Sequence, residues 1–189
     1  MKTSKKSKKY IIASFYLIAL IGILFSCDEE LVFPDTNLLP PVPLDSSSWE
    51  VIDYTSQEDN NGEGANNGRV FHTFDRNPDT FWHTCWSGCT AVPPHHFTVD
   101  MKTSQQIAGF NFIQRTSGTR NIEICEVEIS EDNSTWTSLG QFTLEKSNTG
   151  AVQNKPLSAP VTARYFRFNV VSVFDGTNHA ALAEIAPYF

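Results

Sequence analysis

From residue 48 to its C-terminus the sequence predicts an all-β fold, either a β-sandwich or a jelly roll. Apolar and polar residues alternate in short segments, as they do in strands that bury one face. The alternation places Phe110 and Phe112 on one face of a strand. It places Phe166 and Phe168 on one face of a second strand nearer the C-terminus. Turn-forming residues separate these segments, and none sustains a helical period, which favours a sandwich over an α/β fold.

One expected strand carries an irregularity. Within residues 122–129 the alternation slips by one position at Cys125-Glu126, which predicts a β-bulge. Residues 130–134 form a turn cluster, and Trp136 is expected to open the next strand. Because Cys125 lies inside a strand pattern, we expect it to be a buried free thiol.

The N-terminus predicts export and lipid anchoring. Five lysines precede an apolar run over residues 10–25 and then Ser26-Cys27, the order of an export signal. An uncleaved membrane anchor is the alternative, because the run is only slightly shorter than a bilayer span. Leu24-Phe25-Ser26-Cys27 resembles the lipobox of bacterial lipoproteins, which implies lipidation at Cys27. The acidic residues 28–30 resemble a signal for the outer face, so we expect an outer-membrane, surface-exposed protein.

The expected organisation is a signal peptide at 1–26, a lipidated, Pro-rich linker at 27–47 and one domain at 48–189. The whole chain has 14 basic and 21 acidic residues, a net charge of −7. Without residues 1–26 it keeps 9 basic and all 21 acidic residues, a net charge of −12. Scattered arginines in so acidic a chain argue against nucleic acid as a partner. They also argue that any membrane contact occurs only through the lipid anchor.

Six segments of the expected domain carry motifs of one known family, in that family's order. Phe74–Thr84 resembles its "D-x-N-x-x-T-x-W-H" signature, and Glu128–Trp136 its "V-S-x-D-G-x-x-W" hairpin, with Asn133 in place of the usual Gly. The remaining four are residues 97–101, 107–115, 163–168 and 183–185. The chain resembles the coagulation factor 5/8 type C (discoidin) domains, and among them the family-32 carbohydrate-binding modules. The resemblance implies a galactose-binding-domain-like jelly-roll β-sandwich.

A calcium site is the first function that the resemblance implies. Asp75, Asn77 and Thr80 lie in one tight loop rich in the oxygen ligands that calcium prefers. By resemblance, a structural calcium ion would be held by the side chains of Asp75 and Glu184, by Thr80, and by the carbonyls of His72, Asn77 and Ala183. The alternative is that these are ordinary turn formers and that Glu184 is a solvated charge.

A sugar site is the second. Sugars present hydroxyl groups and an apolar face, which planar donors and an aromatic ring complement. Arg115 and Asn121 match positions that often bond sugar hydroxyls in the family. The further candidates are His83, Trp86, Phe174, Asn178 and His179. His83 could instead be a buried structural histidine and Arg115 a solvated strand end. Trp82 and Trp136 are expected in the core.

Cys85 and Cys89 are expected to form a disulfide; two free thiols, or a zinc site with His83, His95 and His96, are less favoured. We find no catalytic constellation, so no enzymatic activity is expected. The predicted function is a non-catalytic surface lipoprotein that captures glycans or oligosaccharides, of galactose type, with protein partners in a glycan-uptake complex. The alternative is a protein- or lipid-binding adhesion module.

Overall fold

The computed structural model describes residues 41–65 and 67–189. The expected signal peptide at 1–26, the lipidated Cys27 and most of the linker at 27–47 lie outside the described residues. Within the described part of the chain, no helix has the length and apolar character needed to cross a membrane. Inside the expected linker, the segment from Pro43 onward already contacts the domain. Pro43 bridges to Tyr188, and the Leu44 amide donates to the Pro187 carbonyl at 2.9 Å.

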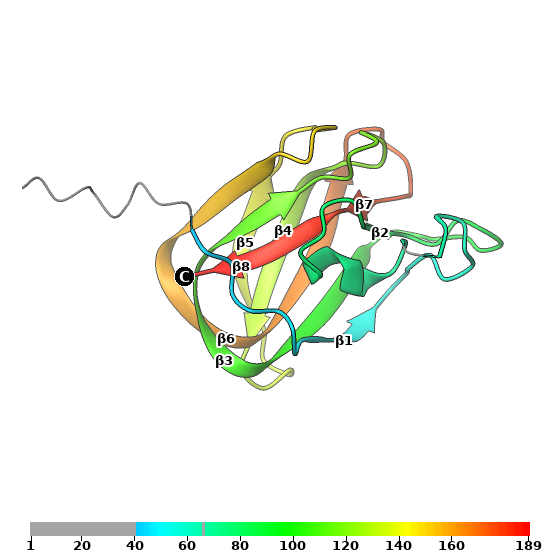
Figure 1. The fold of residues 1–189 in the computed structure, drawn as a ribbon. Helices are drawn as coiled ribbons and strands as arrows, with labels where there is room; N and C mark the ends of the chain where they lie inside the picture. Colours follow the sequence, from blue (N-terminus) through cyan, green and yellow to red (C-terminus); the bar gives the residue numbers. More distant parts are fainter. Residues whose placement is uncertain (1–40, 66) are drawn as a thin grey trace, which may run out of the picture. The chain divides into compact units, whose positions relative to one another are not determined.

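The described residues form eight strands and one short 3-10 helix (Figure 1). In chain order they are β1 (Glu50–Tyr54), the 3-10 helix η2 (Val70–Phe74), β2 (Trp82–His83), β3 (His95–Ile113), β4 (Ile122–Ser130), β5 (Thr137–Thr143), β6 (Val152–Val173), β7 (Ala181–Leu182) and β8 (Glu184–Tyr188).

Two long, curved strands build both layers of the sandwich. The first half of β3 pairs antiparallel with β1 and with the second half of β6, and β4 and β5 extend that layer. The second half of β3 pairs with the first half of β6 and with β8, which gives the other layer. Figure 1 shows β3 and β6 curving from one layer into the other. A small sheet of β2 and β7 lies apart from this path. The expected all-β sandwich is thus confirmed, and its strands pair antiparallel.

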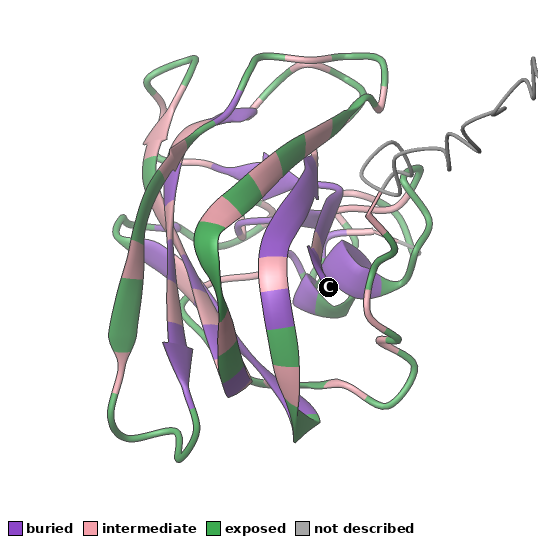
Figure 2. Ribbon diagram, turned by 90° about the vertical axis from the view of Figure 1, so that its left-hand side faces the viewer, coloured by how far each residue is buried: buried purple, intermediate pink, exposed green. Residues whose placement is uncertain are grey.

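The core lies between the layers and is rich in phenylalanine. Buried and exposed residues follow one another along the strands (Figure 2), as the alternation predicted. Phe97 stacks on Phe168 with ring centroids 5.1 Å apart, and Phe112 lies 6.2 Å from Phe168. At Gly109 of β3 the neighbouring strands are so close that a Cβ would lie 2.2 Å from the Tyr188 hydroxyl of β8 and 2.7 Å from the Lys155 carbonyl of β6, so a larger residue there would force these neighbours to shift.

The structure agrees with the local prediction for Cys125 and contradicts the one for Trp136. The β4–β6 register shifts between Ile124 and Cys125, one residue from the expected bulge, and Cys125 is a buried free cysteine. Asn133 has φ of 58°, the left-handed conformation that asparagine tolerates. The prediction that Trp136 lies in the core is wrong. Trp136 precedes β5 at the sheet surface, and the Arg167 guanidinium covers its ring at 4.1 Å.

Candidate functional site

Loops from four parts of the chain converge on a pocket of about 290 Å³. The β1–η2 connection supplies an acid. The end of β2 supplies a histidine, and the loop after β2 supplies a tryptophan. The β3–β4 and β6–β7 loops supply the other lining residues. The lining residues are Glu63, His83, Trp86, Arg115, Thr119, Arg120 and His179. Four of these, His83, Trp86, Arg115 and His179, were predicted from the sequence.

Arg115 is fixed in the pocket by an ion pair and an aromatic ring. Its Nη2 donates to Glu63 Oε2 at 2.7 Å, and its guanidinium lies over the Phe81 ring at 4.0 Å from the centroid. The side chains of Arg115 and Glu63 are only 16% and 12% exposed. Burial lowers the pKa of Arg115, and the Glu63 carboxylate opposes that shift. The group stays charged because the pKa of a guanidinium is so high. Arg115 is therefore a preoriented donor rather than a solvated strand end.

His83 is buried and neutral. Its Nδ1–H donates to the Thr84 carbonyl at 2.6 Å, because a carbonyl can only accept. Burial lowers the pKa of His83 and outweighs the Thr84 carbonyl and the Glu63 carboxylate, which both raise it. In this tautomer Nε2 is an acceptor, and it lies 3.7 Å from Glu63 Oε1. The pocket thus offers a neutral acceptor next to charged donors and acceptors.

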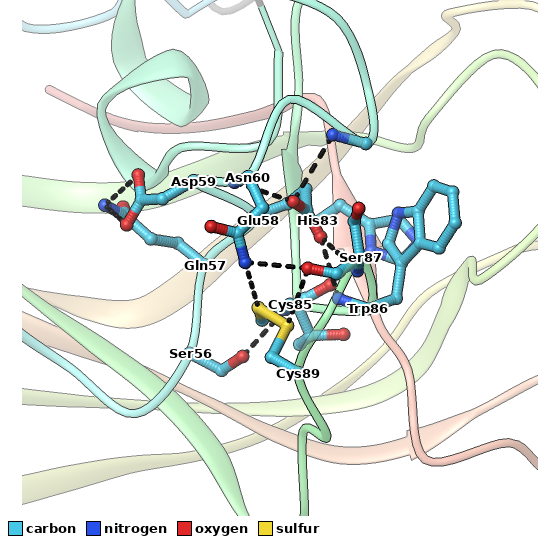
Figure 3. Close-up of a disulfide and its surroundings, with 12 residues drawn as sticks. Ser56, Gln57, Glu58, Asp59, Asn60, His83, Cys85, Trp86, Ser87 and Cys89 are labelled. Carbon is cyan, nitrogen blue, oxygen red and sulfur yellow. Dashed lines mark hydrogen bonds between the residues drawn. A yellow bond between two sulfur atoms is a disulfide. The ribbon is translucent and has the colours of Figure 1, made fainter.

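Trp86 supplies the aromatic surface of the pocket. The residue is 45% exposed, and its Nε1–H donates to Glu63 Oε1 at 3.0 Å. It lies inside the five-residue loop closed by the disulfide between Cys85 and Cys89 (Figure 3). An exposed ring held by its polar edge can stack on an apolar ligand face.

A second ion pair stands at the rim. Arg120 Nη1 donates to Asp175 Oδ2 at 2.8 Å and to the Thr177 hydroxyl at 3.2 Å. Burial raises the pKa of Asp175, but hydrogen bonds from Thr177 and Arg120 lower it below its ordinary value. Both arginines of the pocket are thus paired with carboxylates.

Three predicted ligand residues lie elsewhere than in the pocket lining. Asn121 is 1% exposed; its amide donates to the Arg115 carbonyl at 3.1 Å and accepts from the Ser147 amide at 3.0 Å. It supports the backbone behind Arg115. Phe174 and Asn178 are exposed on the β6–β7 loop, and the Asn178 carbonyl accepts from His95 Nε2 at 2.7 Å.

Sequence reasoning missed Glu63, Thr119 and Arg120. Glu63 lies in a loop rich in Asn and Gly that has no strand period, so no pattern placed it near Arg115. The one available signal was its position as an acid among glycines, Gly62-Glu63-Gly64, in a loop free to approach another segment closely.

A second site brings together two carboxylates that lie near opposite ends of the domain's sequence, those of Asp75 and Glu184. Asp75 accepts from the Thr80 hydroxyl at 2.7 and 2.9 Å, from the Asn77 amide at 2.9 Å and from His72 Nδ1 at 3.1 Å. Glu184, on β8, is 5% exposed, and its Oε1 is buried without a hydrogen-bond partner among the described residues. Burial, and then the neighbouring Asp75 carboxylate, raise the pKa of Glu184 to about 8.

These residues fit a hard cation. Two carboxylates side by side repel each other, and a buried acceptor without a donor is costly, so a divalent cation between them would relieve both penalties. The donors are oxygen atoms, which calcium prefers. Ala183 directly precedes Glu184 in the sequence, and His72 lies three residues before Asp75.

The cysteines and histidines of the alternative zinc site make other contacts. Glu58, Cys85 and Cys89 place ligand-type atoms within 4.8 Å of one another, but the two sulfur atoms are bonded to each other. His95 donates to the Asn178 carbonyl, and His96 pairs with Asp53 at 2.9 Å. The disulfide leaves no thiolate at this place to bind zinc.

Comparisons with known proteins agree with this architecture. A curated sialidase of Micromonospora viridifaciens is 29% identical over 147 residues, which are 75% of this chain and 21% of the sialidase. A galactose oxidase of Gibberella zeae is 30% identical over 152 residues, which are 75% of this chain and 20% of that enzyme. The chain therefore spans about a fifth of the length of these curated relatives.

Solved structures share the fold. The C-terminal domain of a chitobiase from Bacteroides fragilis superposes with a TM-score of 0.69 and 31% identity, covering 77% of this chain and 96% of that one. A family 32 carbohydrate-binding module of Clostridium perfringens, in complex with galactose, gives 0.63 and 22%, covering 79% and 100%. The F5/8 type C domain family matches residues 45–185, three quarters of the sequence. The chain therefore belongs to the F5/8 type C domain family.

Proposed function

We propose that this chain is a non-catalytic sugar-binding module that takes a galactose-type sugar in the Glu63–Arg115–Trp86 pocket. The observation that carries the proposal is the convergence of a fixed guanidinium, a carboxylate, a neutral imidazole and an exposed indole ring on one cavity of about 290 Å³. Each of these groups complements one part of a sugar. Hydroxyl groups can donate to Glu63 and His83 and accept from Arg115, and the C–H face can lie on Trp86.

The charge of the pocket supports a sugar over an anionic lipid headgroup. Arg115 pairs with Glu63 and Arg120 with Asp175, so neither arginine is free to neutralise a phosphate. The galactose complex of the C. perfringens module supports the same ligand class by fold similarity. Protein capture through the exposed rim is the second candidate function, favoured by the exposed side chain of Phe174 beside the pocket loops.

Calcium has a structural role in this proposal. The ion would bind between Asp75 and Glu184 and so tie the loop after η2 to β8. When bound, it supplies positive charge that compensates the two carboxylates. The residues of this chain do the rest: Thr80 and the Asn77 amide hold Asp75, and the strand pairing of β8 with β3 holds Glu184.

The proposed cellular setting follows from the sequence. Cys27 would carry the lipid anchor, and the module would capture glycans at the outer-membrane surface, alone or with protein partners of an uptake complex. Metabolic labelling with a palmitate analogue would test the anchor. Label lost in Cys27→Ser supports it, and label retained in that variant contradicts it.

Titration calorimetry with galactose in calcium buffer tests the binding function. We expect Trp86→Ala to weaken the affinity about tenfold or more, the loss of roughly 1.4 kcal/mol of stacking. Trp136→Ala is the matched control, because that ring lies under Arg167 and outside the pocket lining. Equal affinity of the Trp86 and Trp136 variants would contradict the assignment of the pocket.

A further inference from the structure

The carboxylate of Glu58 is buried, and each of its oxygen atoms accepts hydrogen bonds from two backbone amides. The residue is 2% exposed and lies between β1 and η2. Its Oε1 accepts from the amides of Asn60 at 2.8 Å and Gly62 at 3.3 Å, and its Oε2 from those of Trp86 at 2.8 Å and Ser87 at 2.9 Å. Figure 3 shows the Glu58 side chain beside the disulfide loop.

These four bonds join the two loops that carry the pocket's acid and its aromatic ring. One loop continues from Gly62 into Glu63, and the other holds Trp86 between the disulfide-bonded cysteines. Burial alone would raise the pKa of Glu58, but the four amide donors outweigh it and lower the pKa below its ordinary value. The carboxylate is therefore ionised at neutral pH, and all four donors keep their acceptor.

Further contacts hold the same junction. The Asn60 side chain donates to the Ser87 carbonyl at 2.7 Å, and the Cys85 amide donates to the Ser56 hydroxyl at 2.8 Å. Gly62 lies against the indole, since a Cβ on it would lie 3.0 Å from two ring atoms of Trp86. The ring is thus fixed by its backbone on one side and by Gly62 on another.

Glu58 itself does not line the pocket of Glu63 and Arg115. We propose that Glu58 is a positioning residue for the ligand site, because its carboxylate sets the orientation of the Trp86 ring relative to Glu63. This inference rests on the proposed sugar-binding function. A ring already oriented in the free protein loses less conformational freedom on binding, which raises affinity.

The test uses the full chain in detergent, labelled with 5-fluorotryptophan and followed by fluorine NMR. Trp86→Phe assigns the Trp86 resonance, and Trp49, Trp82 and Trp136 report on the rest of the fold. In Glu58→Gln, the NH2 group of the glutamine side chain replaces one carboxylate oxygen. This group donates hydrogen bonds and faces backbone N–H groups that are also donors. We expect the Trp86 resonance to shift or broaden, the other three to keep their positions, and the galactose affinity to fall about tenfold.

Asp132→Asn is the matched control. Asp132 also accepts backbone amides, from Ser134 at 2.8 Å and Thr135 at 2.7 Å, but in the β4–β5 turn. We expect it to leave the Trp86 resonance and the affinity unchanged. Gly62→Ala provides a second route that keeps the Glu58 side chain. Its methyl group would lie 2.8 Å from Ser87 Cβ and 3.0 Å from two ring atoms of Trp86, so we expect it to displace the ring.

The possible results separate the proposals. An unmoved Trp86 resonance with unchanged affinity in Glu58→Gln would overturn the positioning role. So would a collapse of all four resonances, or a displaced ring in Gly62→Ala with unchanged affinity. Wild-type protein that binds no galactose would contradict the proposed function instead. The Trp86 resonance of Glu58→Gln would still decide whether Glu58 orients the ring.

Discussion

Arg115 and Glu63 form a largely buried ion pair at the centre of the pocket, with Arg115 Nη2 2.7 Å from Glu63 Oε2. The two residues come from loops 52 positions apart in the sequence. The pair fixes both groups before any ligand arrives, so that a sugar meets oriented donors and acceptors rather than mobile charges.

Removing Arg115 should cost both binding and stability. Arg115→Ala leaves the Glu63 carboxylate poorly solvated and without its cation, so we expect galactose binding to vanish and the free energy of unfolding to fall by about 3 kcal/mol. Urea unfolding measures the second effect. Arg167→Ala is the control, because its ion pair with Glu128 is longer, at 3.7 Å, and more exposed. It should cost less than about 1 kcal/mol. Equal losses for the two variants would contradict the central role of the pair.

Calcium should stabilise the domain through Asp75 and Glu184. An ion that binds only the folded state stabilises it by about 2.7 kcal/mol at 100 times its dissociation constant. We expect thermal unfolding of residues 41–189 to move to higher temperature with calcium and back with chelator. Asp75→Asn should abolish this response, whereas Asp132→Asn should keep it. A calcium response that survives in Asp75→Asn would place the ion elsewhere.

Without calcium, stability should depend on the protonation of Glu184. Its pKa is raised in the folded state to about 8, from an ordinary value of 4.5, so folding favours the protonated acid. The stabilisation is therefore complete below pH 4.5 and is lost as the pH rises to about 8. In chelator, the unfolding free energy of the wild type should fall relative to Glu184→Gln by up to about 1.4 kcal/mol per pH unit across this window. A constant difference between the two proteins would refute the assignment.

Cys125 should be inert in the folded protein. Burial raises the pKa of its thiol to about 12, so the reactive thiolate is scarce at pH 8. In residues 41–189 we expect Ellman's reagent to detect no thiol in the native state and only Cys125 in urea. Cys85 and Cys89 should appear after reduction. Rapid labelling of native Cys125 would show that its strand opens.

Strand periodicity predicted the fold because each long strand buries one face. Phe110, Phe112, Phe166 and Phe168 alternate with polar residues and are all fully buried. The same reasoning failed for Trp136, which a guanidinium from β6 covers at the sheet surface. A large aromatic residue next to a strand pattern does not reveal which element will cover it.

The site was less accessible to sequence reasoning than the fold. His83, Trp86 and Arg115 follow recognisable segments, but their shared partner Glu63 lies in an irregular loop. Its place depends on long-range bonds such as those of Glu58, which no local period records. Asn121 was expected to bond sugar hydroxyls, but its amide bonds the backbone of Arg115 and Ser147 and lies outside the pocket lining.

The most direct test of the sugar-binding account is a glycan-array screen of residues 41–189 with calcium, beside Arg115→Ala and the control Arg167→Ala. The account predicts binding to glycans with terminal galactose-type sugars, lost in Arg115→Ala and kept in Arg167→Ala. No binding by the folded wild type, or equal binding by all three proteins, would contradict it.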